Sequence, residues 1–227
     1  MALALEAVVS VLAPPRCAAC DGPVRWLAAF CASCAAQVLP VAPGRAGATA
    51  AYVYGGAIAR AVTRFKYEAR PDLARPLGDL LFRAIEPRRA ELGASLVVVP
   101  VPLHPARLAE RGFNQSALLA RRVASHVKAP AAMRALERLQ DTPRQTSLDR
   151  RARARNVAGA FAVRAPAALR GSDVLLIDDV RTTGSTLDAC ARVVARAGAR
   201  QVAWAVVAQA EGGAPHSMQR QKDNATA

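Results

Sequence analysis

One stretch of the sequence, residues 174–187, sets the strongest limit on how this chain folds. Four apolar residues, Val174–Ile177, predict a strand that is covered on both faces. Asp178 and Asp179 follow directly, and a run of hydroxyl and glycine residues then precedes a predicted helix: Thr182, Thr183, Gly184, Ser185 and Thr186. Free N–H groups at a helix start bind anions, and a glycine lets the backbone approach them closely. The stretch therefore predicts a phosphate cradle beside two carboxylates that suit sugar hydroxyls, directly or through a metal ion. An ordinary strand–turn–helix with a serine N-cap would match this pattern only by chance.

The rest of the chain alternates between strand and helix patterns. The valine-rich run 96–101 predicts a second buried strand. Further strands are expected over 51–54, 159–163 and 201–208, and helices over 58–67, 72–86, 114–127 and 185–197. This alternation predicts an α/β fold with a parallel sheet flanked by helices. Ligands bind at the carboxyl ends of strands in such sheets, so the loops 102–113 and 178–186 are candidate binding segments.

The first of these loops holds candidate diphosphate-binding residues: Leu103, His104, Arg107, Arg111 and Gly112. Guanidinium groups suit a diphosphate, and Gly112 frees the backbone just before the next helix. The alternatives are that both arginines are solvated and that Asn114 is a helix N-cap. A lone loop histidine such as His104 is more often incidental than catalytic.

Four of the five cysteines form two CxxC pairs ten residues apart: Cys17 with Cys20, and Cys31 with Cys34. Two such pairs can present four thiolates to one zinc ion, and four protein ligands leave no open position, so the predicted zinc is structural. The alternatives are disulfides or chance spacing, which are less common in a reducing compartment. Cys190 stands alone in a predicted helix and is expected to be a small buried hydrophobe.

The charge balance concerns partners rather than fold. The chain has 31 basic residues against 17 acidic ones, a formal net charge of +14. This surplus favours a diphosphate substrate or nucleic acid, although a basic surface without such a partner gives the same count. The apolar stretch 1–13 is short, contains Glu6 and has no basic n-region, so we expect a cytoplasmic protein without a membrane span. A second copy of the chain, in a homodimer, is a further candidate partner.

These motifs resemble those of a known family. Residues 174–186 are similar to the thirteen-residue signature of type I phosphoribosyltransferases, which bind 5-phosphoribosyl-1-diphosphate (PRPP). The string Arg111–Gln115, the run 144–161 and the Lys66-Tyr67 pair together resemble ComF-type proteins, which are competence-associated bacterial members of that superfamily and tend to carry an N-terminal zinc-ribbon-like motif. The resemblance covers roughly residues 10–210, and Ala69 departs from it where a glycine is expected.

The resemblance implies roles for the candidate residues. Asp178 and Asp179 would contact the ribose, the loop 182–186 the 5′-phosphate, and the loop 102–112 the leaving pyrophosphate, with Mg²⁺ bound alongside PRPP. Residues 137–158 would form a flexible hood over the substrate, with three candidate contacts: Gln145, Arg155 and Asn156. The alternative for residues 137–158 is a basic loop that contacts nucleic acid.

The sequence does not identify the acceptor, so three functions stand. The first is a phosphoribosyltransferase that acts on an unknown nitrogen acceptor. The second is a non-catalytic regulator that senses PRPP. The third is a competence or DNA-uptake accessory protein that binds single-stranded DNA or a protein of the competence machinery, as the resemblance implies.

Composition and motifs also divide the chain. We expect an N-terminal helix over 1–16, a zinc-ribbon-like motif over 17–38, a linker over 39–50, the phosphoribosyltransferase domain over 51–210 and a disordered tail over 211–227.

Overall fold

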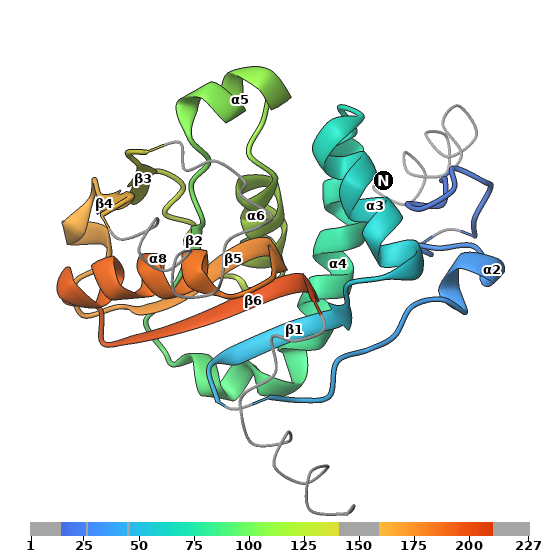
Figure 1. Ribbon diagram of the computed structural model, residues 1–227. Helices are drawn as coiled ribbons and strands as arrows, with labels where there is room; N and C mark the ends of the chain where they lie inside the picture. The colour runs from blue at the N-terminus through green and yellow to red at the C-terminus, as the bar shows by residue number, and fades with distance from the viewer. Residues whose placement is uncertain (1–14, 26, 45, 141–158, 211–227) are drawn as a thin grey trace, which may run out of the picture.

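The central feature of the computed structural model is a four-stranded parallel sheet (Figure 1). The structure describes residues 15–25, 27–44, 46–140 and 159–210. The strand order is β1-β6-β5-β2, and each neighbouring pair runs parallel. The strands are β1 (Ala48–Val53), β2 (Leu96–Pro100), β5 (Asp173–Arg181) and β6 (Gln201–Gln209). The predicted parallel sheet is thereby confirmed.

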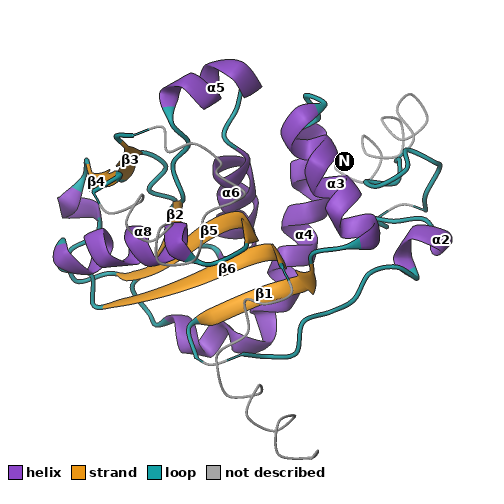
Figure 2. Cartoon of the chain, in the orientation of Figure 1, coloured by secondary structure: helices purple, strands orange, loops and turns teal. Residues whose placement is uncertain are grey.

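Helices cover both faces of the sheet, as Figure 2 shows. Leu175 and Ile177 of β5 pack in a core with α3, α4 and α6, whereas Val174 and Leu176 pack in a second core with α8. This alternation follows from the two-residue period of a strand, and it explains why the whole run is apolar. The helices are α2 (Ala32–Ala35), α3 (Gly56–Tyr67), α4 (Ala74–Ile85), α5 (Pro105–Arg111), α6 (Gln115–Val127) and α8 (Ser185–Arg196), and the 3₁₀ turns are η1 (Pro71–Leu73), η2 (Glu86–Leu92) and η3 (Pro166–Ala168).

A small antiparallel pair lies outside the main sheet. It consists of β3 (Leu136–Arg138) and β4 (Phe161–Val163), and its buried residues Leu136 and Phe161 belong to the same core as α8. The strand expected over 159–163 contains β4, whereas no strand was expected at β3. The hood candidates Gln145, Arg155 and Asn156 lie between these strands, outside the described residues.

Two segments at the carboxyl ends of β2 and β5 also differ from the sequence-based expectation. The loop 102–113 contains a helix, α5, which begins at Pro105 and ends where Gly112 takes a positive φ of 76°. The strand expected over 174–177 extends to Arg181, because its pairing with β6 continues to Gln209. The two aspartates are therefore held inside a strand rather than in the loop after it.

Candidate functional site

Asp178 and Asp179 lie near the carboxyl end of β5, where the start of α6 and the end of α3 supply their side-chain partners. The Ser116 hydroxyl, at the start of α6, donates to Asp178 Oδ1 over 2.8 Å, and the Asp179 N–H donates to the same oxygen over 2.9 Å. Burial and the neighbouring Asp179 carboxylate raise the pKa of Asp178 to about 7. This carboxyl group therefore exchanges its proton near neutral pH.

Asp179 is held by a cation from a different element. Lys66 Nζ, near the end of α3, lies 2.7 Å from Asp179 Oδ1, and the two side chains are only 14% and 9% exposed. Ala69, where a glycine was expected, takes a left-handed φ of 50°. This conformation explains the preference for glycine at that position. Lys66 nevertheless reaches Asp179.

The hydroxyl-and-glycine run forms the turn between β5 and α8. Thr183 Oγ1 lies 2.9 Å from Ser185 Oγ, Thr182 is exposed, and Thr186 is partly exposed in the first turn of the helix. Gly184 is the N-cap of α8 with a φ of 84°, and a Cβ there would lie 2.9 Å from the Arg181 guanidinium. The start of this twelve-residue helix thus combines hydroxyls, backbone N–H groups and a nearby cation, which suits a phosphate.

Arg111, the last residue of α5, contacts the start of α6 and the end of α3. Arg111 Nη1 donates to Gln115 Oε1 over 3.2 Å, and its Nη2 donates to the Tyr67 hydroxyl over 3.4 Å. His104 instead caps α5, because its Nδ1 accepts from the Ala106 N–H over 3.3 Å. Asn114 caps α6, as one of the alternatives predicted. The other residues of the segment are partly exposed or exposed: Leu103, Arg107 and Gly112.

Three residues of this region were not among the sequence candidates: Ser116, Gln115 and Arg181. The sequence did contain a signal for Gln115 and Ser116, because both are polar residues in the first turn of a predicted helix. Gln115 ends the R-G-F-N-Q string, and Ser116 follows it. Arg181 lies within the signature stretch, where a single cation among hydroxyls and carboxylates is notable. Its guanidinium lies 5.1 Å from the Trp204 ring centroid.

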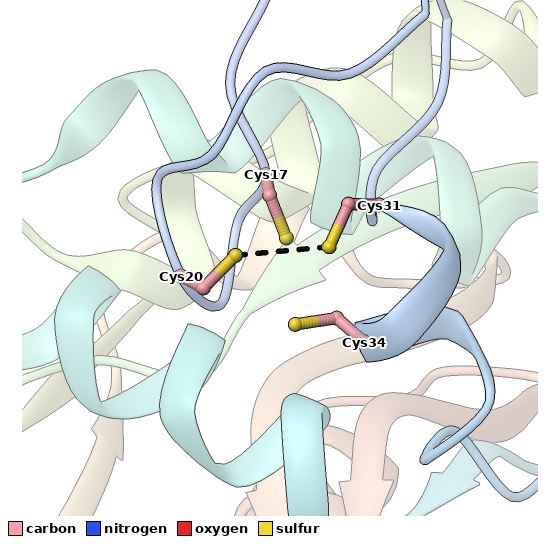
Figure 3. Close-up of side chains that lie close together, drawn as sticks. All are labelled: Cys17, Cys20, Cys31 and Cys34. Atoms are coloured by element: carbon pink, nitrogen blue, oxygen red, sulfur yellow. Dashed lines mark hydrogen bonds between the residues drawn. The ribbon is translucent and has the colours of Figure 1, made fainter.

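The four N-terminal cysteines converge on one point (Figure 3). All four sulfur atoms lie within 4.8 Å of one another, with 3.7 Å between Cys20 Sγ and Cys31 Sγ, and all four are free thiols. Tetrahedral zinc–thiolate bonds of about 2.3 Å place sulfur atoms roughly 3.8 Å apart. This donor set therefore fits zinc, and four protein ligands would leave a bound ion no open coordination position.

The cysteine cluster packs against α3. Arg60 Nη2 lies 3.7 Å from Cys34 Sγ, and Arg64 Nη1 donates to the Cys17 carbonyl oxygen over 3.4 Å. Arg64 also forms an ion pair with Asp21, which follows the first cysteine pair in the sequence, and its Nη2 lies 3.2 Å from Asp21 Oδ1. The fifth cysteine, Cys190, is fully buried in the core that contains α8 and behaves as the expected small hydrophobe.

Comparison with known proteins agrees with this geometry. The family model of the phosphoribosyl transferase domain matches residues 114–224, which contain α6, β5, the hydroxyl-and-glycine turn and α8. The chain is thus a protein with a phosphoribosyltransferase domain. With its N-terminal four-cysteine cluster and the relatives below, it is similar to ComF/YhgH proteins.

Two relatives illustrate this similarity. The DNA utilization protein YhgH of Salmonella typhimurium is 34% identical over 143 residues, which are 62% of each chain. Competence protein F of Haemophilus influenzae is 27% identical over 195 residues, which are 83% of this chain and 82% of that protein. The chain thus matches somewhat less than two thirds of the YhgH protein.

A solved structure of the allosteric regulatory enzyme of purine biosynthesis is similar over 63% of this chain and 29% of that one, with 18% identity and a TM-score of 0.43. Within the described ranges, none of the helices is both long and apolar enough to cross a membrane.

Proposed function

We propose that this protein binds PRPP together with Mg²⁺ at the carboxyl ends of β2 and β5 and transfers its phosphoribosyl group to a nitrogen acceptor. The observation that carries the proposal is the placement of two carboxylates and a hydroxyl-and-glycine phosphate turn on one strand–turn–helix unit. A ribose 5-phosphate needs both kinds of group within one short distance. The match to a phosphoribosyl transferase domain over the same residues supports the choice of ligand.

Each part of the ligand has candidate partners. Asp178 and Asp179 bind the ribose hydroxyls, and the turn binds the 5′-phosphate through five residues: Thr182, Thr183, Gly184, Ser185 and Thr186. The segment 103–112 faces the leaving pyrophosphate. Ser116 and Lys66 hold one oxygen of each carboxylate, so both acids are fixed before the ligand arrives.

The reaction breaks the bond between the sugar C1 and the diphosphate oxygen, and the nitrogen lone pair of the acceptor then forms the new bond at C1 with inversion. The sugar becomes positively charged on the way, and the diphosphate leaves with the bonding electrons. Carboxylate oxygens are ligands that Mg²⁺ accepts, and the bound ion supplies charge neutralisation at the diphosphate. The protein contributes orientation and fixed charges around the sugar.

Calorimetry with PRPP and Mg²⁺ tests the binding step. The wild type is expected to bind, and the Asp178→Asn/Asp179→Asn variant is expected to lose binding because it no longer offers carboxylates to the ribose. Asp188→Asn is the matched control: this exposed carboxylate on the first turn of α8 is expected to leave binding intact. Equal binding by the double variant would refute the assigned site.

A second assay tests turnover. Pyrophosphate release from PRPP is measured across a panel of nitrogen bases and amines, and release with one acceptor class supports a transferase. Binding without release from any of them supports instead a regulator that senses PRPP, because fold and ligand recognition do not by themselves establish catalysis.

A role in DNA handling is the second candidate. It rests on the names of the two relatives and on the net charge of +14. Electrostatic binding to single-stranded DNA weakens steeply with salt. Such binding supports this role if it is reduced by Cys17→Ser or by Arg151→Ala, in the basic segment 137–158 and outside the described residues. Undetectable binding at low salt removes it.

A further inference from the structure

The helix α3 lies beside the N-terminal segment that carries the cysteines, as Figure 1 shows, and it also contacts the paired aspartates. Near its end, Arg64 Nη1 donates to the Cys17 carbonyl oxygen over 3.4 Å. Two residues further along, Lys66 Nζ lies 2.7 Å from Asp179 Oδ1. Residues two apart point to nearly opposite sides of a helix, because one turn takes 3.6 residues. The two contacts therefore place α3 between the cysteine cluster and the aspartates.

Arg64 is a polar link between α3 and the cysteine loop. Its Nη1 also donates to the Ala18 carbonyl oxygen over 3.4 Å, and its Nη2 lies 3.2 Å from Asp21 Oδ1. The Arg64 side chain is only 13% exposed. Hydrogen bonds from a charged, planar guanidinium are strong and fix the geometry of their acceptors. One side chain of α3 thus holds both the backbone and a carboxylate of the loop that carries the first cysteine pair.

Apolar packing joins the same loop and helix. Ala57, in the first turn of α3, shares a buried cluster with Cys17 and Cys34. Ala18, between the first two cysteines, is fully buried and belongs to the core that contains Phe65 of α3. Buried side chains are packed as closely as molecules in a crystal, so the loop and the helix cannot shift independently of each other.

The end of α3 also packs on the segment that holds the other aspartate. The ring centroid of Phe65 lies 5.7 Å from that of Phe113, which immediately precedes the N-cap of α6. Ser116, in the first turn of α6, donates to Asp178 Oδ1. Both carboxylates therefore depend on the position of α3: Asp179 through its ion pair, and Asp178 through the segment on which Phe65 packs.

A bound zinc ion would determine whether the cysteine loop keeps its shape. The described part of this loop contains one helix, the four-residue α2, and a segment of this size buries too little apolar surface to hold its shape alone. The four sulfur atoms lie within 4.8 Å of one another, so one ion can hold all of them. The free energy of metal binding in such a segment is free energy of folding. Loss of the ion would therefore loosen the surface on which α3 packs.

We propose that zinc at the four-cysteine cluster and PRPP at the paired aspartates bind cooperatively, and that Arg64 is the positioning residue through which the cluster acts on α3. The inference rests on the proposed function and deepens it, since it names what regulates the same site. Coupling between two binding sites is reciprocal: if zinc raises the affinity for PRPP by some factor, PRPP raises the affinity for zinc by the same factor. The protein then holds PRPP tightly only while its N-terminal cluster carries metal.

Arg64→Met is the sharpest test, because it keeps the apolar stem of the side chain and removes the guanidinium. Asp21 is not left without a cation, since Arg70 Nη1 lies 3.0 Å from its Oδ1. Calorimetry with PRPP and Mg²⁺ is performed on the wild type and the variant, each with zinc and after zinc has been removed by a chelator that is then dialysed away. We expect zinc removal to weaken PRPP binding roughly fivefold to fiftyfold in the wild type and less than about threefold in Arg64→Met.

The affinity for zinc gives a second readout, measured by competition with a chromogenic chelator in excess Mg²⁺. We expect PRPP to raise the zinc affinity of the wild type by the factor found in calorimetry. The Asp178→Asn/Asp179→Asn variant should show no such effect, which excludes direct chelation of zinc by PRPP. Arg121→Met is the matched control: this exposed arginine lies on α6, and its replacement is expected to leave the coupling unchanged. Circular dichroism of each zinc-free form reports whether the sheet is intact.

The outcomes separate this inference from the proposed function. An unchanged PRPP affinity after zinc removal overturns the inference, while PRPP binding by the zinc-loaded wild type still supports the proposed function. Equal weakening in the wild type and in Arg64→Met also overturns it, because zinc would then support the whole fold rather than act through this contact. A zinc-loaded wild type that does not bind PRPP refutes both.

Discussion

The ion pair between Lys66 and Asp179 gives the most direct test of how the site is held together. The pair joins α3 to β5 at 2.7 Å, and both side chains are largely buried. Lys66→Met keeps the length and apolar stem of the side chain but removes its charge. It leaves two adjacent carboxylates without a cation, and the pKa of Asp178 rises further because Lys66 lowers it in the wild type.

The size of the effect follows from distance and burial. At 2.7 Å and an effective dielectric constant of about 20, the Coulomb attraction is about 6 kcal/mol, and the loss of hydration by both groups offsets much of it. Removal of one partner from a buried pair costs about 3–5 kcal/mol, because the other charge is left uncompensated. Proton uptake by the adjacent carboxylates limits the loss to about 3 kcal/mol, or roughly 6–12 °C in Tm for a chain of this size.

Denaturant unfolding at pH 8 and pH 5 measures this cost for Lys66→Met, Asp179→Asn and the double variant. The double variant is expected to recover about 1–3 kcal/mol relative to the sum of the single changes, and the loss in Lys66→Met is expected to be smaller at pH 5. Lys128→Met is the matched control, since this exposed lysine ends α6, and its replacement should stay within about 0.5 kcal/mol. Additive single changes, or a Lys66→Met effect as small as the control, would refute the reasoning.

Three other changes have defined outcomes. Gly184→Ala places a Cβ at a φ of 84° and 2.9 Å from the Arg181 guanidinium, so we expect weaker PRPP binding and a loss of about 1–2 kcal/mol in unfolding free energy. Gly171→Ala is the control: at a φ of 71° with nothing within 4 Å, it should lose stability but keep its affinity for PRPP. Asp178→Asn should have a higher free energy of unfolding than the wild type at pH 8, and this difference should narrow toward pH 4. The reason is that the folded Asp178 carboxyl has a pKa of about 7 and keeps a proton that the unfolded chain releases above 3.8. A difference that is constant with pH in denaturant unfolding would contradict this. Cys31→Ser is expected to lose zinc in metal analysis and to melt at a lower temperature, whereas Cys190→Ala should retain the metal, and equal zinc contents would exclude the four-cysteine site.

The local features of the fold were predictable because each depends on neighbouring residues. The apolar run of β5 and the turn before α8 lie within thirteen residues of signature, so pattern alone located the sheet, the paired acids and the helix start. The cysteine spacing predicted the cluster for the same reason, since two short CxxC turns need only one small span between them.

The contacts between elements were not predictable in the same way. Lys66 and Asp179 are far apart in the sequence, and only the packing of α3 beside the end of β5 brings them together. Ser116 and Gln115 could have been read as ordinary polar residues of an amphipathic helix, since nothing local shows that they are buried. The helix α5 was missed within the expected loop 102–113, although Pro105 at its first position and Gly112 just after its end are helix signals.

The helix α3 connects the two parts of the molecule that the sequence suggested separately. Its residues Arg60 and Arg64 contact the cysteine cluster, and two residues further along, Lys66 pairs with Asp179. A helix transmits displacement along its axis as a nearly rigid body, because each turn is hydrogen-bonded to the next. The cysteine cluster therefore fixes one side of the helix that supplies the cation of the aspartate pair, and the N-terminal motif is part of the structural support of the site rather than an independent appendage.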